Sequence, residues 1–431
     1  MSPSGSGSTL ALLGGTPTGP VAPEPHPRFT PDVIDRVSDL LRRGCTVGLN
    51  KHVAEIREAE ESIAAWQGVS HCLGTSSGHA ALHCCLMGLE ISSGDEVITT
   101  PYTWGASTSC ILHNNAIPVF ADVCPETGLL DPATIEERVT PRTRAILAVH
   151  IFGQPANMSA IRAIANRHGL VVIEDGSQAH GALHQNQKVG TFGDASGFSC
   201  MGGKLLASSE AGYMVTPRAD VYWKASLCTQ HMGRSSEPGF PEDLLRYVDS
   251  LVYTYRLSPI NAVLLTAQLR KIDAENQGRR RNVAHFRQAM AGVESARFPS
   301  YAEGDDPVYH MLTMNFCPEV AGVSRDTYLA ALHAEGVGIF AYVPSPIPTW
   351  PRLNWQTYTG PRVMWTESLR QSGVDYRTME CPNAHTKVAR SLEMSWNYIE
   401  EDPERIQRLA AAFWKVEENL GALREWERRG A

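Results

Sequence analysis

Lys204 is the residue whose type and setting suggest covalent chemistry. It follows a pair of glycines in the segment Phe198-Ser199-Cys200-Met201-Gly202-Gly203-Lys204. A lysine kept from water among apolar residues loses its proton more readily and can attack a carbonyl to form a Schiff base. Ser199, earlier in the same segment, could give a hydroxyl to a phosphate. The alternative is a solvated surface lysine, because lysines are mostly exposed.

Asp175 is the second candidate, in the segment 174–182 (Glu-Asp-Gly-Ser-Gln-Ala-His-Gly-Ala) directly after the apolar run Leu170–Ile173. A carboxylate at the end of a strand can pair with a pyridinium nitrogen. That pairing keeps a heteroaromatic ring protonated, so the ring can act as an electron sink. A helix cap or a turn is the alternative for this aspartate.

Two further segments follow strand-like runs. The first, Gly74-Thr75-Ser76-Ser77-Gly78-His79-Ala80, opens a helical pattern, and the backbone amides at a helix start bind phosphate well. The second, Pro101-Tyr102-Thr103-Trp104-Gly105-Ala106, offers an indole that could stack on a flat ring. A plain capped helix and core packing are the alternatives. Each signal is weak alone, and their combination is more specific.

Short apolar runs alternate with helical stretches between about residues 70 and 216. This rhythm predicts an α/β fold with a mainly parallel seven-stranded sheet and helices on both faces. Ligands in such folds gather at the carboxyl ends of the strands, where all four segments would lie. The predicted strands are His71–Gly74, Glu96–Thr100, Ile117–Ala121, Arg144–His150, Leu170–Glu174, Ser196–Cys200 and Gly212–Thr216.

The pattern changes after the seventh run. Ser258–Met290 reads as one or two long helices, and the part from about residue 300 onward mixes strands and helices like a smaller α+β domain. We therefore predict three parts. Residues 1–9 form a disordered tail, residues 10–257 a large cofactor-binding domain with an N-terminal arm, and residues 258–431 the connecting helix and a small C-terminal domain.

Composition narrows the function classes. The chain has 431 residues, a formal net charge of −8 and 43% hydrophobic residues, so nucleic acid and anionic membranes are disfavoured as partners. No apolar run is long enough to span a bilayer, and the N-terminal residues lack a signal-peptide pattern. The ten cysteines form no CxxC pair, which predicts no metal site and favours the reducing cytoplasm.

Together these segments resemble the DegT/StrS family of aminotransferases that depend on pyridoxal 5'-phosphate (PLP) and have fold type I. The context of the lysine looks like that of 3-amino-5-hydroxybenzoate synthases and cyclitol aminotransferases. The likeness runs along nearly the whole chain. It includes the opening Leu10–Pro17, the segment Val149–Pro155, and the motifs Tyr255–Ser258 and Cys381–Asn383.

The resemblance implies a PLP site in a homodimer whose active sites are completed by the partner subunit. Lys204 would bind the cofactor as a Schiff base and move the proton. The roles implied for the other residues are pairing with the pyridine nitrogen for Asp175, a hydrogen bond to the phenolic oxygen for Gln178, ring stacking for Trp104, and phosphate binding for Ser199 and for the backbone of Ser77, Gly78 and His79.

Several positions depart from the family pattern. His79 stands where Thr is usual, and Thr254 stands where an Asn commonly reaches the partner's phosphate site. The segments Tyr342–Pro346 and Met394–Tyr398 replace the usual substrate-side segments.

The leading hypothesis is transfer of an amino group from glutamine or glutamate to a keto cyclitol, keto sugar or related ring ketone, in secondary-metabolite biosynthesis such as that of antibiotics. One alternative is a PLP-dependent enzyme that dehydrates and aromatises, cyclises or epimerises its substrate. Another is a non-catalytic protein of the same fold.

Overall fold

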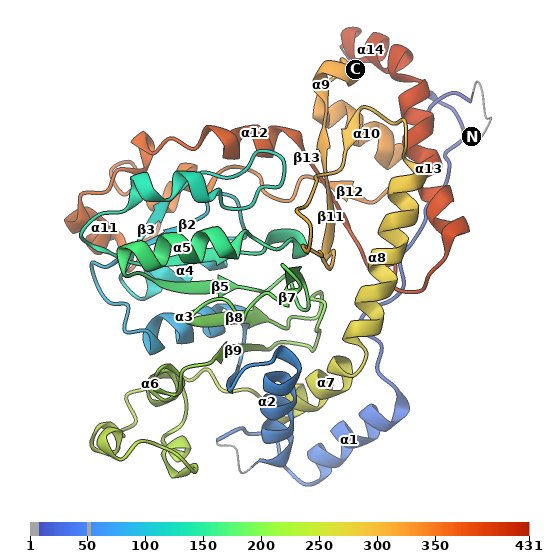
Figure 1. Ribbon diagram of the computed structural model, residues 1–431. Coiled ribbons are helices and arrows are strands. Elements are labelled where there is room, and N and C mark those ends of the chain that lie inside the picture. Colours follow the sequence, from blue (N-terminus) through green and yellow to red (C-terminus); the bar gives the residue numbers. More distant parts are fainter. Residues whose placement is uncertain (1–7, 50–52, 431) are drawn as a thin grey trace.

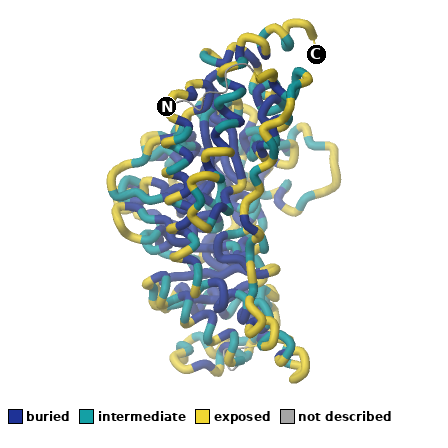
Figure 2. The backbone as a smooth tube through the Cα atoms, turned by 90° about the vertical axis from the view of Figure 1, so that its right-hand side faces the viewer, coloured by how far each residue is buried: buried dark blue, intermediate teal, exposed yellow. Residues whose placement is uncertain are grey.

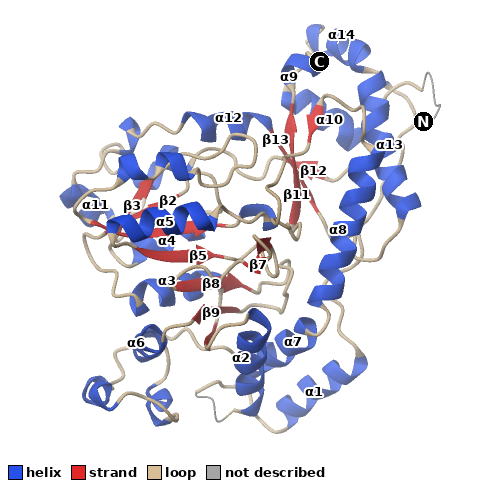
Figure 3. Cartoon of the chain, viewed as in Figure 1, coloured by secondary structure: helices blue, strands red, loops and turns tan. Residues whose placement is uncertain are grey.

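A seven-stranded sheet forms the centre of the larger part of the molecule (Figure 3). The computed structural model describes residues 8–49 and 53–430, so the predicted tail 1–9 lies almost wholly outside the described residues. The strand order is β1-β9-β8-β5-β4-β2-β3. The strands are β1 (His71–Thr75), β2 (Glu96–Thr99), β3 (Ile117–Phe120), β4 (Thr143–Val149), β5 (Val171–Asp175), β8 (Ala195–Ser199) and β9 (Gly212–Thr216).

The sheet is mainly parallel, as predicted. The pairs β5–β8, β4–β5, β2–β4 and β2–β3 are parallel, and β9 alone runs against its two neighbours, β1 and β8. The seven strands coincide with the seven predicted runs to within a few residues. Side chains of β2 and β3 are buried throughout, which explains why the sequence shows continuous apolar runs rather than alternation.

Helices cover both faces of this sheet (Figure 1). On one face α3 (Gly78–Gly88) packs between α4 (Ala106–His113) and α6 (Ala219–Thr229), and α5 (Met158–His168) lies on the other face. Burial follows this layering. The backbone trace is coloured as buried in the interior of the molecule and as exposed mainly along the outer loops (Figure 2). The fold therefore brings the carboxyl ends of the parallel strands to one edge between two helical layers.

The smaller part contains a second, antiparallel sheet with the order β10-β11-β13-β12. Its strands are β10 (Ala296–Arg297), β11 (Met311–Phe316), β12 (Ile339–Phe340) and β13 (Ser391–Ser395). The helices of this part are α9 (Pro318–Ala321), α10 (Arg325–Ala334), α13 (Pro403–Glu418) and α14 (Leu420–Arg428). This is the α+β arrangement that the sequence predicted.

Two consecutive helices connect the parts, α7 (Pro259–Leu269) and α8 (Ile272–Ala289), so the predicted helical stretch is divided in two. Ser258 begins α7, because its hydroxyl accepts the amide hydrogen of Asn261 at 3.3 Å and proline follows it. Helix α8 rises from the large sheet to the small one (Figure 1). The remaining elements near α7 are α1 (Pro31–Arg42) and α2 (Ala54–Gln67).

Some segments pack across the predicted domain boundary at residue 257, which stays a prediction. Leu10 belongs to the hydrophobic cluster of the small sheet. Ile347, Trp365 and Leu369 belong to the cluster around the large sheet. The helices α11 (Thr366–Ser372) and α12 (Pro382–Arg390) belong to the segment that contains Trp365 and Leu369.

A small antiparallel hairpin of β6 (Leu183–His184) and β7 (Gln187–Lys188) follows β5 along the chain.

The described residues contain no helix long and apolar enough to cross a membrane. Within the same ranges, no cluster of three or more histidine, cysteine or acidic side chains is arranged to hold a metal ion. All ten cysteines carry free thiols, and most of them are buried.

Candidate active site

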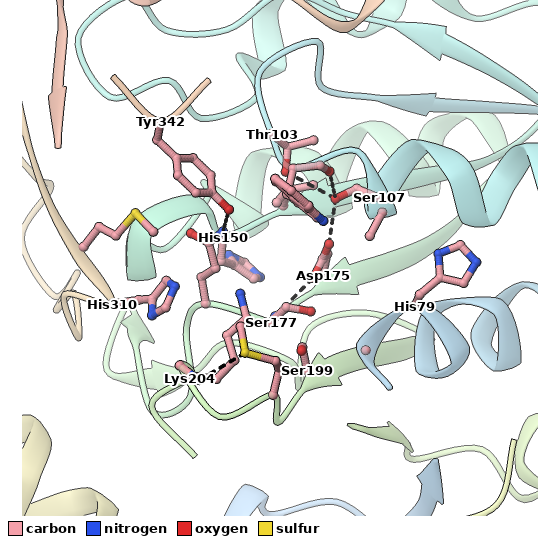
Figure 4. A pocket seen from close by; sticks show the side chains of 18 of the residues that line it. His79, Thr103, Ser107, His150, Asp175, Ser177, Ser199, Lys204, His310 and Tyr342 are labelled. Atoms are coloured by element: carbon pink, nitrogen blue, oxygen red, sulfur yellow. Dashed lines mark hydrogen bonds between the residues drawn. The ribbon is translucent and has the colours of Figure 1, made fainter. Parts of the chain in front are cut away.

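A cavity of about 580 Å³ opens where the large sheet meets the small one (Figure 4). Eight of the nine residues singled out from the sequence line it, namely Ser77, Gly78, His79, Trp104, Asp175, Gln178, Ser199 and Lys204. Other lining residues, which the sequence did not single out as site residues, include Thr103, Ser107, His150, Ser177, His310, Met311, Tyr342 and Ser395. The cavity therefore gathers residues from almost the whole length of the chain.

Strand pairing brings the two central groups to the same edge. Asp175 is the last residue of β5, and it is in register with Gly197 on the parallel strand β8. Ser199 ends β8 two residues later. Because parallel strands share one carboxyl edge, the loops that follow both strands open into the same space.

Lys204 lies in the loop that joins β8 to β9. Its amide donates to the carbonyl of Met201 at 2.8 Å, which makes a tight turn. Burial lowers the pKa of the Lys204 amine, although the negative charge of Asp175 opposes the shift. The amine makes no hydrogen bond or ion pair with residues 8–49 or 53–430, so it is available to an incoming carbonyl.

Asp175 is held in a fixed orientation at the bottom of the cavity. Only 5% of the residue is exposed. Its Oδ2 accepts a hydrogen bond from the hydroxyl of Ser107 at 2.7 Å, and its Oδ1 accepts one from the amide of Ser177 at 3.0 Å (Figure 4). A carboxylate still has free lone pairs after two such bonds and can accept a further proton donor from the cavity.

The start of α3 and the end of β8 are in close contact. Ser77 caps α3, because its hydroxyl accepts the amide hydrogen of Ala80 at 3.1 Å. A Cβ added to Gly78 would lie 2.4 Å from the Cβ of Ser199, so only glycine permits this approach. The amides of the first helical turn and the Ser199 hydroxyl therefore border the same small volume, which suits an anion such as phosphate.

Gln178 has its amide group oriented by the backbone. Its Oε1 accepts the amide hydrogen of Phe152 at 2.6 Å, so its Nε2 faces the cavity and donates to the Tyr342 hydroxyl at 3.4 Å. Phe152 adopts a left-handed backbone conformation at φ 63° to present that amide. Burial raises the pKa of Tyr342 to about 12, so its phenol keeps its proton.

Trp104 is an exposed aromatic residue on the wall of the cavity. The residue is 63% exposed, although tryptophan is usually well buried. Its ring lies 6.2 Å from the ring of Tyr342 at an angle of 36°. An indole left open beside a cavity offers a face on which a flat ligand can stack.

His79 and Thr254 lie differently from the others. The ring of His79 turns toward α4, where its Nε2 pairs with Nδ1 of His113 at 2.9 Å. Burial lowers the pKa of His79 to about 4, and the nearby His113 adds to the shift. Only the backbone of His79 is thus placed for the predicted phosphate contact. Thr254 is exposed and does not line the cavity of its own chain, so its role in a partner's site stays a prediction.

Sequence reasoning missed the residues that orient or cover the predicted ones. Ser107 lies in the first turn of α4, three residues after Trp104, and that spacing was the available signal. His310, Tyr342 and Ser395 come from the small sheet, with no local motif around them. Only their place in segments that depart from the family pattern drew attention to Tyr342 and Ser395.

The side chains present fit PLP. The cofactor has an aldehyde, a ring nitrogen, a phenolic oxygen and a phosphate, and the cavity offers a partner of the right chemistry for each. These partners are the amine of Lys204, the carboxylate of Asp175, the amide of Gln178 and the contact between Ser199 and the start of α3.

The fold is that of fold type I PLP-dependent aminotransferases. The solved aminotransferase of Psychrobacter cryohalolentis aligns with 93% of this chain and 100% of its own at a TM-score of 0.78 and 25% sequence identity. The model of the DegT/DnrJ/EryC1/StrS aminotransferase family matches residues 31–376. The chain belongs to this family, and it is an aminotransferase.

Two curated relatives illustrate the range of the family. The L-glutamine:2-deoxy-scyllo-inosose aminotransferase of Micromonospora echinospora is 36% identical over 426 residues, which cover 96% of this chain and 99% of that protein. The UDP-N-acetyl-3-dehydro-alpha-D-glucosamine 3-aminotransferase of Acidithiobacillus ferrooxidans is 37% identical over 291 residues, which cover 67% and 74%. The alternative of a dehydrating, cyclising or epimerising enzyme is not favoured by these relatives.

Proposed function

We propose that the chain binds PLP on Lys204 and moves the amino group of glutamine or glutamate to the ketone of a cyclitol. The observation that carries the proposal is the half-buried amine of Lys204, which has no hydrogen-bond partner among the described residues and shares one cavity with Asp175 and Gln178. Bound PLP would supply an aldehyde carbon that can carry the amino group and a pyridine ring that acts as an electron sink. The protein supplies positioning and proton transfer.

Each protein group has one task in this scheme. The amine of Lys204 would act as general base and acid, taking a proton from one carbon and delivering it to another. Asp175 would stabilise a proton on the ring nitrogen, and the hydrogen bond from Ser107 restrains the orientation of that carboxylate. Gln178 would orient the ring through its Nε2, and Trp104 would cover one face of the ring and exclude water.

The lining of the cavity favours a neutral, polyhydroxylated acceptor. Among the described residues that line the cavity, Lys204 is the only lysine or arginine, so a diphosphate would find no arginine partner there. Hydroxyl and imidazole groups of Ser395, Tyr342 and His310 can instead pair with ring hydroxyls. The similarity to the scyllo-inosose aminotransferase over nearly the full length also supports a keto cyclitol.

The test uses the colour of the purified protein. Absorbance of protein-bound PLP should appear, borohydride should fix the cofactor to Lys204, and Lys204→Ala should abolish both. Glutamine or glutamate should bleach the colour, and 2-deoxy-scyllo-inosose should restore it faster than a nucleotide-linked keto sugar. Lys224→Ala, at a partly exposed lysine paired with Glu90, is the control. Protein that binds PLP but that no amino donor bleaches would refute the proposal.

We also propose a cytoplasmic homodimer. An apolar groove lined by Leu112, Trp350 and Trp365 adjoins Trp104, and it would suit the exposed apolar side chains of a second copy. Leu251 is 89% exposed and lies close to Thr254, the residue predicted to reach the partner's phosphate site. The ten free thiols support a reducing compartment.

Light scattering on the purified protein should give a particle mass twice that of one chain. Leu251→Asp should lower both this particle mass and the enzymatic activity. A fully active monomer would contradict the shared site. Asp249→Asn, on the same loop, is a control for the effect of changing charge near residue 251.

A further inference from the structure

The N-terminal arm, residues 8–30, runs beside α8 from the small sheet toward α1 (Figure 1). Its first anchor is Glu335, a fully buried carboxylate at the end of α10. This carboxylate accepts the amide hydrogens of Ala11 and Thr18, both at 2.8 Å, and pairs with Lys415 at 2.9 Å. The start of the arm is therefore fixed to the small part of the molecule.

A second anchor lies farther along the arm. Glu24 is 7% exposed and pairs with Arg405 of α13 at 2.6 Å. It also accepts the amide hydrogen of Ile399 at 3.1 Å, and the hydroxyl of Tyr398 donates to the carbonyl of Val21 at 2.6 Å. Hydrogen bonds to buried charged groups are among the stronger ones, so this stretch of the arm should move with the small part.

Two residues beyond Glu24, the arm reaches the lysine loop. The ring of His26 is almost fully buried, with 1% of its side chain exposed, and its Nε2 lies 2.9 Å from the carbonyl oxygen of Lys204. A carbonyl can only accept, so Nε2 carries the hydrogen and donates it. The backbone amide of Lys204 donates to the carbonyl of Met201, so with the bond from His26 both backbone polar groups of Lys204 are held.

The other nitrogen of the ring, Nδ1, faces Glu275 at 3.6 Å and has no hydrogen-bond partner among the described residues. Burial lowers the pKa of His26, and the nearby Arg279 adds to the shift, while Glu275 and the Lys204 carbonyl oppose it. The neutral ring is thus favoured. Its contribution to the lysine loop is a single directed hydrogen bond rather than a charge.

We propose that His26 is a positioning residue: through its hydrogen bond to the Lys204 carbonyl, the N-terminal arm ties the small part of the molecule to the loop that carries the reactive amine. The small part also supplies His310, Tyr342 and Ser395 to the cavity. A shift of that part would therefore reach the lysine through its backbone as well as through the cavity wall. The idea rests on the proposed role of Lys204.

The test compares His26→Phe, which fills the space without a donor, with His26→Gln, whose side-chain amide can still donate. The first readout is the rate at which an amine-reactive reagent modifies Lys204 in the cofactor-free protein, as measured by mass spectrometry. The second is the PLP dissociation constant, and the third is the pH titration of the bound-cofactor absorbance. Thermal unfolding shows whether each variant is folded.

His26→Phe should change the lysine modification rate and weaken PLP binding, each by about tenfold, as expected for the loss of one buried hydrogen bond, and should shift the absorbance titration. His26→Gln should stay within about threefold of the parent. Arg405→Met, which releases the arm from α13 but leaves His26 intact, should change the modification rate in the same direction. Arg28→Ala, at an exposed residue of the arm, is the control.

Parental values for a folded His26→Phe protein would overturn the proposal. Equal changes in the Lys204 modification rate and in PLP affinity for His26→Gln and His26→Phe would also overturn it, because packing rather than the hydrogen bond would then be responsible. An unchanged modification rate in Arg405→Met would refute the link to the small part. If the parent protein binds no PLP, the proposed function fails, and the modification rates in the cofactor-free protein still decide whether His26 positions Lys204.

Discussion

The hydroxyl of Ser107 donates to Oδ2 of Asp175 across 2.7 Å and joins the first turn of α4 to the end of β5. The loop that leads into α4 carries Trp104, three residues before Ser107. The group that would cover the ring and the group that would hold its nitrogen are therefore fixed to each other. A displacement of the Trp104 loop would therefore also displace the Asp175 carboxylate, so this hydrogen bond contributes to preorganisation of the site.

Replacing Ser107 with alanine should lower kcat about tenfold and leave the fold intact, because Asp175 would lose one of its two charge-assisted hydrogen bonds. The measurement is single-turnover bleaching by glutamine. Thr108→Val is a matched control on the same helix, since the Thr108 hydroxyl is buried without a partner. Equal rates for Ser107→Ala and the parent would show that the amide of Ser177 alone suffices to orient the carboxylate.

Asp175→Asn should keep PLP bound but lower turnover at least about a hundredfold. The amide cannot stabilise a protonated ring nitrogen, so the electron sink is weakened while the remaining contacts persist. Bound cofactor is measured by its absorbance after gel filtration, and turnover by the amino product. Turnover near that of the parent protein would refute the role assigned to this carboxylate.

Gly78→Ala should weaken PLP binding more than it destabilises the protein. The added methyl group would lie 2.4 Å from the Cβ of Ser199 and would push β8 away from the start of α3. Titration of the cofactor-free protein with PLP measures the affinity, and thermal unfolding measures the stability. Gly88→Ala, on the same helix but facing α6, is a contrast that should affect stability alone. An unchanged affinity in a folded Gly78→Ala protein would argue against phosphate binding at this contact.

Lys204→Met should stabilise the cofactor-free protein at neutral pH. Burial lowers the folded-state pKa of Lys204, so the charged amine disfavours folding wherever the unfolded chain is protonated. This cost is fully present below the folded pKa and disappears as pH rises through the ordinary lysine value of about 10.4. Thermal melts at several pH values should show a difference from the parent that narrows at alkaline pH. A difference independent of pH would assign the gain to packing instead.

Much of the large sheet could be predicted because its strands are buried on both faces and read as apolar runs. The residues after β1, β2, β5 and β8 could then be assigned to one edge, and the structure places Ser77, Trp104, Asp175 and Lys204 around one cavity there. These inferences needed only local patterns and the rule that parallel strands share a carboxyl edge.

The remaining features depend on contacts between distant residues. His310 and Tyr342 reach the cavity because β11 and β12 pair with β13, and no local signal encodes that pairing. The orientation of the His79 ring depends on His113 of another helix. The fixation of His26 depends on the loop that carries Lys204, far along the chain. Single-sequence patterns do not carry such tertiary information.

The arm described above has a consequence for the order in which the molecule can be completed during synthesis. Its residues leave the ribosome before those of the large sheet, whereas Glu335, Arg405 and Lys415, which secure it, are made after that sheet. The segment must stay unattached while the large sheet forms, and it can settle against the lysine loop only once the final helices exist. A nascent chain that stops before α13 would therefore contain all strands of the large sheet but lack the Arg405 and Lys415 contacts that hold the arm near the Lys204 loop.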